Sequence, residues 1–361
     1  MEMPIQPRRM ATTSAGRGDM TTEFVRGGKR VTLDDVARRA GVSRALVSIV
    51  MRDVPGASAA TRRRVLATAQ ELGYRPDARA RSLAGNSSKL IGVLFDTASA
   101  YHFSLLDGLY SAAGEFGYSL LLSALTDTRD ERRAVQSLSD FQFDGLIMLG
   151  PSVAHPVLSG QLPVVVVGWT VDEPDVDSVH TSDTTALNLA VDFLAGLGHR
   201  RIAHIDGGDS LISSSRRRAY LAAMDRRGLG RSSRVIAGGE TQLAGQRAAH
   251  ELLRHSRALP TALVCFNDET AVAAMGVLQQ HGIDIPGQVS MIGYDDNKIA
   301  RERGIDLTSI AQQPRELARL AVERLHDRLL GKEILGREIV LEPTLTMRST
   351  AAAAPASRTK K

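Results

Sequence analysis

Hydrophobic positions change their spacing along the chain. Between residues 31 and 72 they recur at helical intervals, in three short segments separated by turn residues. From residue 90 onward, short runs of consecutive apolar residues alternate with longer segments of helical periodicity. The two ends, 1–28 and 349–361, show neither pattern and are rich in small and basic residues. The patterns therefore predict a small all-α module, a larger α/β body and two disordered tails.

The small module opens with "VTLDDVARRAGVSRALVSIVMRD", residues 31–53. Thr32, followed three residues later by Asp35, forms a variant of the capping box at the start of a first helix. Gly41 ends that helix, because glycine adopts the left-handed conformation most easily. Ser43 then caps a second helix. Two short helices joined by a tight turn with glycine are typical of a helix-turn-helix.

A third helix follows the turn "DVPGA". Ser58 is its predicted cap and Gly73 closes it. Three helices of this size make only a small core, so we interpret the module as a support that presents its second helix to a partner. The predicted core positions are Leu33, Val36, Ala37, Val47, Val50, Val65, Leu66, Ala69 and Leu72.

Charge is distributed unevenly over the chain, whose formal net charge is +5. Residues 29–89 contain thirteen Lys and Arg against five Asp and Glu, whereas residues 90–361 carry an excess of four negative charges. A basic module ahead of an acidic body indicates a polyanionic partner for the module alone. A charge run by itself more often marks a solvated surface, or a module that binds protein. The helix-turn-helix pattern favours DNA.

The major groove is about 12 Å wide and admits one helix, whose N-terminal side chains meet base edges. Arg44 is the candidate for a bidentate contact with guanine, and Ala45 offers an apolar contact such as one to a thymine methyl. Arg62, Arg63 and Arg64 are placed for phosphates. The full set of predicted DNA contacts outside the linker is Thr32, Ser43, Arg44, Ala45, Ser48, Ile49, Ser58 and Thr61.

The body alternates strands and helices. Near-continuous apolar strands separated by helices predict parallel sheets covered on both faces, and the length favours two α/β lobes. The predicted strands are "LIGVLF", "YSLLLSA", "FDGLIMLG", "PVVVVG", "RIAHID", "ALVCF" and "SMIGYDD". The predicted helices are 104–117, 183–198, 216–228, 244–257 and 268–282.

Ligands of parallel sheets bind beyond the carboxyl ends of the strands, where polar side chains can pair with the hydroxyls of a polyol or sugar. Arg216 is predicted to open a helix after the loop "GGDSLISSS". Strand-end Asp and Asn residues also commonly cap the next helix, and this alternative stays open for each of them. The candidate ligand-binding residues are Asp96, Tyr101, His102, Trp169, Arg216, Asn267 and Asp295.

Several classes of protein lack support in the sequence. Cys265 is the single cysteine, which excludes a disulfide within the chain and fits a reducing cytosol. No apolar run is long enough for a membrane span, and none follows the first arginines as in a secretory signal. Dinucleotide, P-loop and nucleophile-elbow motifs are absent, and the nine histidines are scattered. We therefore expect a cytoplasmic protein without enzymatic activity, metal or cofactor.

Residues 31–94 closely resemble the DNA-binding headpiece and hinge of the LacI/GalR family of bacterial transcriptional repressors. The resemblance is carried by "VTLDDVARRAGVS", "VS" at 47–48, "TRRRVLATAQELGYRPDARARSLAG" and "IGVLF". It implies a hinge, 76–89, that becomes helical on operator DNA, where Leu83 of each subunit of a dimer enters the minor groove. The family often has arginine where this chain has Ile49, which leaves the operator sequence open.

The resemblance continues through the body to about residue 348, in "LGHRRIAHIDG", "SRRRAYLAAM" and "FNDETAVAAMGVLQQHGIDIPGQVSMIGYDD". It implies an effector-binding core similar to periplasmic sugar-binding proteins, with three crossings between the lobes, one of them at "AQQP". It also implies a last helix, 314–331, that returns to the first lobe. Arg216, Asn267 and Asp295 match the family's ligand positions. Tyr101 and His102 replace two phenylalanines found in many members, so this pocket is more polar.

The sequence thus predicts a homodimeric repressor with a helix-turn-helix headpiece, 29–75, a hinge, 76–89, and a two-lobed effector domain, 90–348. A small molecule, expected to be a carbohydrate, would control its affinity for double-stranded operator DNA. A solute-binding receptor or an enzyme on the same α/β core is the alternative. The effector, the operator and any tetramer formation are not readable from the sequence.

Overall fold

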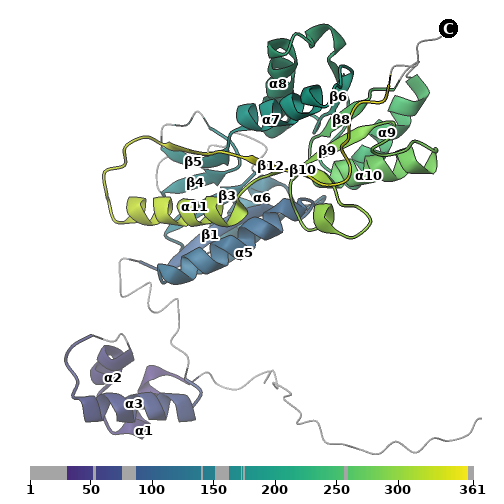
Figure 1. The fold of residues 1–361 in the computed structure, drawn as a ribbon. Coiled ribbons are helices and arrows are strands. Elements are labelled where there is room, and N and C mark those ends of the chain that lie inside the picture. Colours follow the sequence, from purple (N-terminus) through teal and green to yellow (C-terminus); the bar gives the residue numbers. More distant parts are fainter. Residues whose placement is uncertain are drawn as a thin grey trace, which may run out of the picture. The chain divides into compact units, whose positions relative to one another are not determined.

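The computed structural model describes residues 31–51, 54–74, 87–139, 141–150, 162–171, 173, 175–255 and 259–356. The chain divides into two compact units, Met1–Ala80 and Arg81–Lys361. Within the described residues of the first unit there are three helices, and the second unit contains two sheets with their covering helices (Figure 1). None of the helices in the described ranges is long and apolar enough to span a membrane.

The first unit consists of α1 (Leu33–Ala40), α2 (Arg44–Met51) and α3 (Ala59–Glu71). As predicted, Thr32 and Asp35 form a complete capping box, and Gly41 adopts a left-handed φ of 64° after α1. The Ser43 hydroxyl accepts from the amide of Leu46, 3.2 Å away. These caps satisfy amides that the helices cannot pair themselves.

The core of this unit is small and aliphatic. One predicted core position is wrong: Leu66 is 47% exposed. On α3 the buried face is occupied instead by Thr68, whose hydroxyl donates to the Arg64 carbonyl 2.9 Å away. The fully buried apolar residues are Val36, Ala37, Ala40, Val47, Val50, Val65 and Ala69.

The first sheet of the second unit is entirely parallel, in the order β11-β5-β4-β3-β1-β2. Alternate strand residues enter two different cores, because successive side chains point to opposite faces. On β1, Val93 packs with α5 and α11, whereas Leu94 packs with α6. Its strands are β1 (Leu90–Asp96), β2 (Ser119–Leu125), β3 (Gly145–Leu149), β4 (Val164–Val167), β5 (Val176–Thr181) and β11 (Glu338–Leu341).

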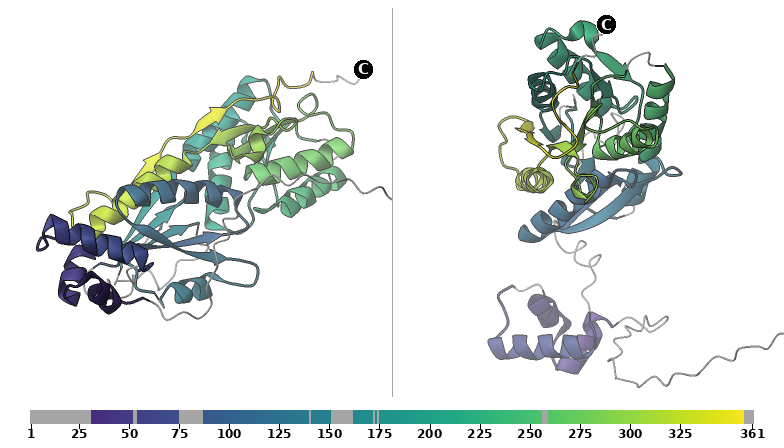
Figure 2. Two further views of the ribbon diagram at one scale, coloured as in Figure 1. Left: turned by 90° about the horizontal axis from the view of Figure 1, so that it is seen from below. Right: turned by 45° about the vertical axis from the view of Figure 1, so that its right-hand side comes forward.

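The helices of this first lobe cover both faces of the sheet. They are α5 (Ala100–Glu115), α6 (Glu131–Ser139) and α11 (Pro314–Leu329). Helices α5 and α11 lie side by side over one face (Figures 1 and 2). Gly108 permits this approach, because a Cβ atom there would come within 2.8 Å of the Ala318 Cβ.

The second sheet has the order β12-β10-β9-β8-β6-β7, and only the β10–β12 pair is antiparallel. Helices α7 and α8 cover one face and α9 and α10 the other. The strands are β6 (Ile202–Ile205), β7 (Arg234–Ile236), β8 (Ala262–Cys265), β9 (Ser290–Asp295), β10 (Thr308–Ala311) and β12 (Thr344–Thr346). The helices are α7 (Asp183–Gly196), α8 (Leu211–Arg226), α9 (Gln242–His255) and α10 (Asp268–Gln280), with 3-10 turns at Gly230–Ser232 and Ile299–Arg301.

The chain crosses between the two lobes three times, as predicted. The crossings follow β5, β10 and β11, and the last one brings β12 back into the second sheet (Figure 1). They lie close together: the Ser182 amide donates to the Leu341 carbonyl 3.0 Å away, and the Gln313 side chain donates to the Glu342 carbonyl at the same distance. The two-lobed α/β architecture predicted from the sequence is therefore present.

Candidate functional site

The N-terminal end of α2, which the sequence predicts to contact DNA bases, is exposed. Ser43, Arg44 and Ala45 are exposed, while Ser48 and Ile49 are partly buried. The Arg44 side chain is 68% exposed, and its Nε lies 3.8 Å from Asp34 Oδ1, so within the part of the chain that the structure describes it is restrained by a weak, exposed ion pair. This arginine is available to an external partner.

The Ile49 side chain on α2 packs partly against the turn before α3. Gly56, in the turn before α3, has a φ of 130°, and a Cβ there would lie 3.4 Å from Ile49 Cγ2. Part of the Ile49 side chain therefore covers this turn. The same turn is held by Arg62, whose Nη2 donates to the Val54 carbonyl 2.9 Å away. Arg62 thus supports the turn, and Arg63 and Arg64 are the exposed arginines of α3.

The hydroxyls predicted to meet phosphates all lie at helix N-termini. Thr32 Oγ1 donates to Asp35 Oδ2, 2.7 Å away, and Ser58 Oγ accepts from the Thr61 amide at 3.2 Å. The Ser58 and Thr61 hydroxyls are 2.9 Å apart. Helix N-termini attract anions through their free amides and dipole. Leu83 and most of the predicted hinge lie outside the described residues.

The segment Ser87–Lys89, just before β1, is held by the carboxylate of Asp144. The sequence did not predict this contact. Asp144 accepts hydrogen bonds from Ser87 Oγ, from the amide and hydroxyl of Ser88, and from the Lys89 amide, at 2.5–2.9 Å. Lys89 has a left-handed φ of 56°, so this anchor holds an unfavourable backbone conformation. Burial alone would raise the pKa of Asp144, but these hydrogen bonds lower it.

Six of the seven predicted ligand residues line a cavity of about 130 Å³ between the lobes. They come from both lobes. Asp96, Asn267 and Asp295 lie at the carboxyl ends of parallel strands, where the sequence predicted the site, whereas Tyr101 and His102 lie on α5 and Arg216 on α8. The last residues of β1 in the first lobe and of β9 in the second, Asp96 and Asp295, line this one cavity. The six are Asp96, Tyr101, His102, Arg216, Asn267 and Asp295.

Arg216 is buried and held from several sides. Its Nε donates to Asp183 Oδ1 at 3.3 Å, and its Nη1 donates to the Phe266 carbonyl at 2.6 Å. The guanidinium carbon lies 3.5 Å from the centroid of the Tyr294 ring. Burial would lower the pKa of Arg216, but Tyr294, Asp183 and Asp295 raise it, so the charge is retained. The prediction that Arg216 opens its helix is wrong: α8 begins at Leu211, after a Ser210 cap.

Asp295 ends β9 and faces Arg216, with 4.0 Å between its Oδ1 and the arginine Nη2. Gln312 Nε2 donates to the same oxygen at 2.8 Å. Burial raises the pKa of Asp295 to about 7, against the lowering effect of Arg216. Asp295 and Asp296 both have positive φ, 105° and 50°. Such strain persists only where surrounding contacts hold it, and it clusters at functional sites.

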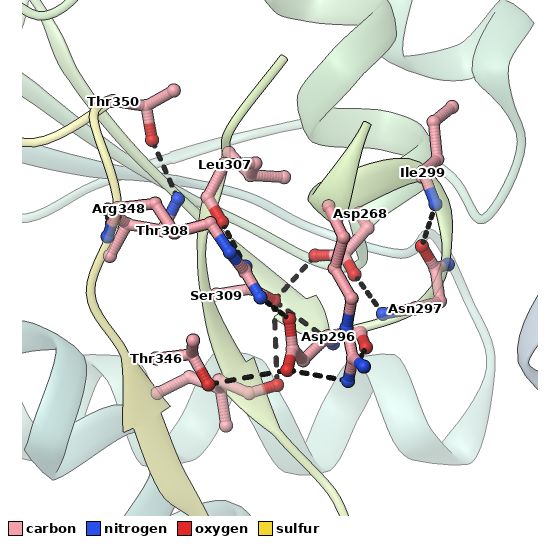
Figure 3. Close-up of polar contacts among 12 residues, drawn as sticks. Asp268, Asp296, Asn297, Ile299, Leu307, Thr308, Ser309, Thr346, Arg348 and Thr350 are labelled. Atoms are coloured by element: carbon pink, nitrogen blue, oxygen red, sulfur yellow. Dashed lines mark hydrogen bonds and ion pairs between the residues drawn. The ribbon is translucent and has the colours of Figure 1, made fainter. Parts of the chain in front are cut away.

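The contacts that hold this strained turn come from the second lobe's strands and the C-terminal segment (Figure 3). Asp296 accepts from Arg348 Nη2 at 2.5 Å and from Arg301 Nη2 at 2.9 Å. The Asp296 amide donates to Ser309 Oγ, which itself donates to buried Asp268 at 2.6 Å. Asp296 therefore has a structural role, while Asp295 is turned towards the cavity.

Tyr101 and His102 lie on the first turn of α5, which starts four residues earlier than predicted. Tyr101 lines the cavity, and its buried hydroxyl has no hydrogen-bond partner among the described residues. His102 Nδ1 accepts from the Asp96 amide at 3.0 Å. Burial lowers the pKa of His102 to about 4, so the ring is neutral near pH 7.

Asn267 and Trp169 fit a ligand role less directly. Asn267 caps α10 through its Oδ1, which accepts from the Thr270 amide at 2.8 Å, and its Nδ2 donates to the Glu240 carbonyl. The capping alternative thus holds for Asn267, although it lines the cavity. Trp169 is buried in the core of the first lobe and lines neither of the two cavities described for the cleft.

Several cavity residues were missed because nothing in the local sequence distinguishes them. Glu240 follows the short strand β7, Ser99 and Ser210 precede helices, and Phe266 ends an apolar run. The cleft continues into an open groove of about 1400 Å³ that includes Lys298 and Arg315. Across the described ranges, no group of three or more His, Cys, Asp or Glu residues is placed to hold a metal ion.

Two protein-family models match the chain. The model for bacterial regulatory proteins of the lacI family matches residues 32–77, and the model for a periplasmic binding protein-like domain matches residues 191–351. The first range corresponds to the helical unit. The second begins within α7 and contains the rest of the second lobe together with α11 and β11 of the first lobe.

Two curated relatives are similar over nearly their whole length. The HTH-type transcriptional repressor PurR of Vibrio parahaemolyticus is 30% identical over 327 residues, which cover 88% of this chain and 98% of that protein. The ribose operon repressor of Haemophilus influenzae is 31% identical over 325 residues, with the same coverage.

Solved structures extend the likeness to the fold. A Lac repressor dimer bound to operator and the anti-inducer ONPF has a TM-score of 0.81 at 28% identity, covering 90% of this chain and 100% of that one. A LacI transcriptional regulator from a Rhodococcus species has a TM-score of 0.71 at 36% identity, covering 74% and 99%. A complex of the regulator CelR with cellobiose has a TM-score of 0.66 at 27% identity, covering 89% and 100%.

Proposed function

Because the chain belongs to the LacI family of bacterial regulatory proteins, we propose that α2 reads operator DNA and that the cleft binds a small carbohydrate-like effector. The chain is a DNA-binding transcriptional repressor regulated by a small-molecule effector. We further propose that it acts in the cytoplasm as a homodimer without enzymatic activity. The named relatives are repressors, and one similar structure is a dimer on its operator.

The exposed end of α2 supports the assignment of DNA contacts. Arg44 is free of buried partners and can offer two parallel donors to guanine. Ser43 and Ala45 lie beside it in the exposed first turn. Thr32, Ser58 and Thr61, at the starts of α1 and α3, would contact phosphates and so position the helix without specifying sequence. Ser48 and Ile49 would contact bases from the second turn, and Leu83 would enter the minor groove.

The observation that carries the effector site is the convergence of Asp96, Arg216 and Asp295 on one cavity. They belong to elements of both lobes, so a bound molecule would contact both sides of the cleft. A ligand that binds one lobe arrangement more tightly shifts the equilibrium towards it, typically by about 1–3 kcal/mol. In this proposal the shift alters the spacing of the two hinges in the dimer and releases the operator.

Selection from a random pool of duplex oligonucleotides tests the DNA half of the proposal. The full-length protein should enrich near-palindromic fragments, because a two-fold symmetric dimer reads two related half-sites. Absence of any enrichment, with and without a panel of metabolites, would contradict it. On an enriched fragment, Leu83→Ala should weaken binding and reduce bending in a gel assay while the thermal stability of the protein stays unchanged.

A solute-binding receptor or an enzyme on the same core is the competing function. A thermal-shift screen of sugars and other small metabolites separates these cases, because a ligand that binds only the folded state raises the melting temperature. Stabilisation without turnover, together with release of the enriched fragment, supports the repressor. Conversion of a stabilising compound into product would support the enzyme.

A further inference from the structure

The charges around the small cavity differ from those of a site for an anion. Asp96, Glu240 and Asp295 line it, and among its described lining residues Arg216 is the only Lys or Arg. His102, the only histidine among those residues, is neutral near pH 7 because burial lowers its pKa to about 4. Three carboxyl groups therefore face one guanidinium.

That guanidinium is already engaged by the protein. Nε of Arg216 donates to Asp183 Oδ1, and Nη1 donates to the Phe266 carbonyl. The remaining nitrogen, Nη2, lies 4.0 Å from Asp295 Oδ1. Anion sites built on arginine use two parallel donors of one guanidinium. Two of the five N–H groups of Arg216 are thereby used, and Asp183 and Asp295 already balance its charge, so this arginine attracts a phosphate or carboxylate less strongly than a free guanidinium would.

The cavity is instead rich in acceptors. Asp96 Oδ1 accepts from the Ala98 amide at 2.8 Å, and Asp295 Oδ1 accepts from Gln312. An ionised carboxylate has about four acceptor positions, so Asp96 retains capacity for further donors. Asp295 is partly protonated near pH 7 and gains the same capacity when a bound cation beside it lowers its pKa. Tyr101 is an independent sign of a ligand, because this residue lines the cavity and no described residue pairs with its buried hydroxyl. Buried polar groups are rarely left unpaired.

We infer that the effector carries a protonated amino group on a small polyhydroxylated frame, that is, an amino sugar. The inference rests on the proposed function, since it concerns the ligand of the same cleft. The ammonium supplies three donors and a positive charge among Asp96, Glu240 and Asp295, and the hydroxyls pair with Tyr101 and Arg216 Nη2.

Calorimetric titration of the full-length protein near pH 7 with matched sugars tests this charge preference. The probes are glucosamine, galactosamine and mannosamine, their parent hexoses, their N-acetyl derivatives and the hexose 6-phosphates. At least one amine should bind about tenfold or more tightly than its parent, since a single partly buried charge pair can supply that ratio. The 6-phosphates should bind most weakly.

Substitutions then assign the preference to the cavity. Asp295→Asn, which keeps the shape, and Glu240→Gln, at the exposed rim, should each bring the ratio between amine and parent towards unity. Asp209→Asn is the matched control, because Asp209 is an exposed carboxylate that does not line the cavity. Its ratio should stay at the wild-type value. Parent hexoses that bind as tightly as the amines, a 6-phosphate that binds most tightly, or no binding by any amine would each overturn the inference.

A DNA measurement separates this inference from the proposed function. The operator fragment enriched by the wild-type protein is incubated with each sugar, and release is followed by fluorescence anisotropy. Release by a neutral or anionic compound alone would leave the repressor intact and reject the amine. Failure to enrich any fragment, while the calorimetric preference for amines persists, would reject the repressor and retain the ligand class.

Discussion

The polar side chains of the headpiece and of the cleft differ in how far along the sequence their hydrogen-bond partners lie. In the headpiece, Thr32, Ser43 and Ser58 each pair with an amide three residues further along the chain. In the cleft, Arg216 pairs with groups 33 and 50 residues away. The headpiece contacts are exposed and local, whereas those of the cleft are buried and long-range. Substitutions in the cleft should therefore cost more and affect a larger part of the molecule.

The largest expected effect that follows from this contrast is that of Arg216→Ala. Removal of the guanidinium leaves the Asp183 carboxylate without its buried partner, and breaking a buried pair costs about 3–5 kcal/mol. Urea unfolding should show this loss, and the response to any effector should disappear. Arg218→Ala, on the exposed side of the same helix, is the control and should change stability by less than about 0.5 kcal/mol. Equal losses in the two variants would refute the assigned role.

Arg44→Ala should have an effect confined to DNA recognition. Its present ion pair with Asp34 is exposed and contributes little to stability, so the fold should be retained. Loss of a bidentate base contact costs about 1–3 kcal/mol of discrimination at one base position. Competition assays with single-base variants of the enriched operator measure this. A uniform loss of affinity for all sequences would show that Arg44 contacts phosphate instead.

The pH dependence of stability should reveal Asp295. Its pKa in the folded protein is about 7, above the value of about 4 for an unfolded chain, so folding binds a proton between these values. Its contribution to stability is complete below pH 4 and is lost as the pH rises through 7, with a slope of up to about 1.4 kcal/mol per pH unit. Asp295→Asn should remove that slope from the unfolding free energy measured between pH 5 and 8. An unchanged slope would place the titration elsewhere.

A cap substitution in the headpiece should give the smallest effect. Thr32→Ala removes the side-chain half of the capping box and should destabilise the headpiece by about 1 kcal/mol. Thr32→Ser keeps the hydroxyl and should restore most of the stability. Amide hydrogen exchange in α1 reports the change locally. A loss much larger than 2 kcal/mol would mean that Thr32 has contacts beyond its cap.

The same difference in distance explains which parts of the fold the sequence predicted. The apolar strands β1, β3, β4, β8 and β9 were identified because their runs are unambiguous. Strand β10 was missed because Thr308 and Ser309 look polar. They are fully buried, and Thr350 and Asp268 satisfy their hydrogen bonds from distant parts of the chain.

The start of α8 was placed too late for a related reason. The serines of "SLISSS" suggest a loop, but Ser213 is buried in the helix and its hydroxyl accepts from the Gly207 amide at 2.9 Å. In the cleft, the rule that ligands lie beyond parallel strands led to Asp96, Asn267 and Asp295. It could not assign roles to them. Both the oxygen and the nitrogen of the Asn267 side-chain amide form hydrogen bonds within the protein, while Asp295 faces the cavity.

The amino-acid sequence by itself determined the class of the protein: three capped helices ahead of a two-lobed α/β body, with polar groups at the strand ends. These features follow from periodicity and from contacts three or four residues apart. Only the tertiary structure decided that Asp144 holds the Ser87–Lys89 segment, that Arg216 forms an ion pair with Asp183, and that Glu240 lines the cavity. Such pairings arise because packing brings together segments that are far apart in the sequence, and no local sequence pattern shows which segments will meet.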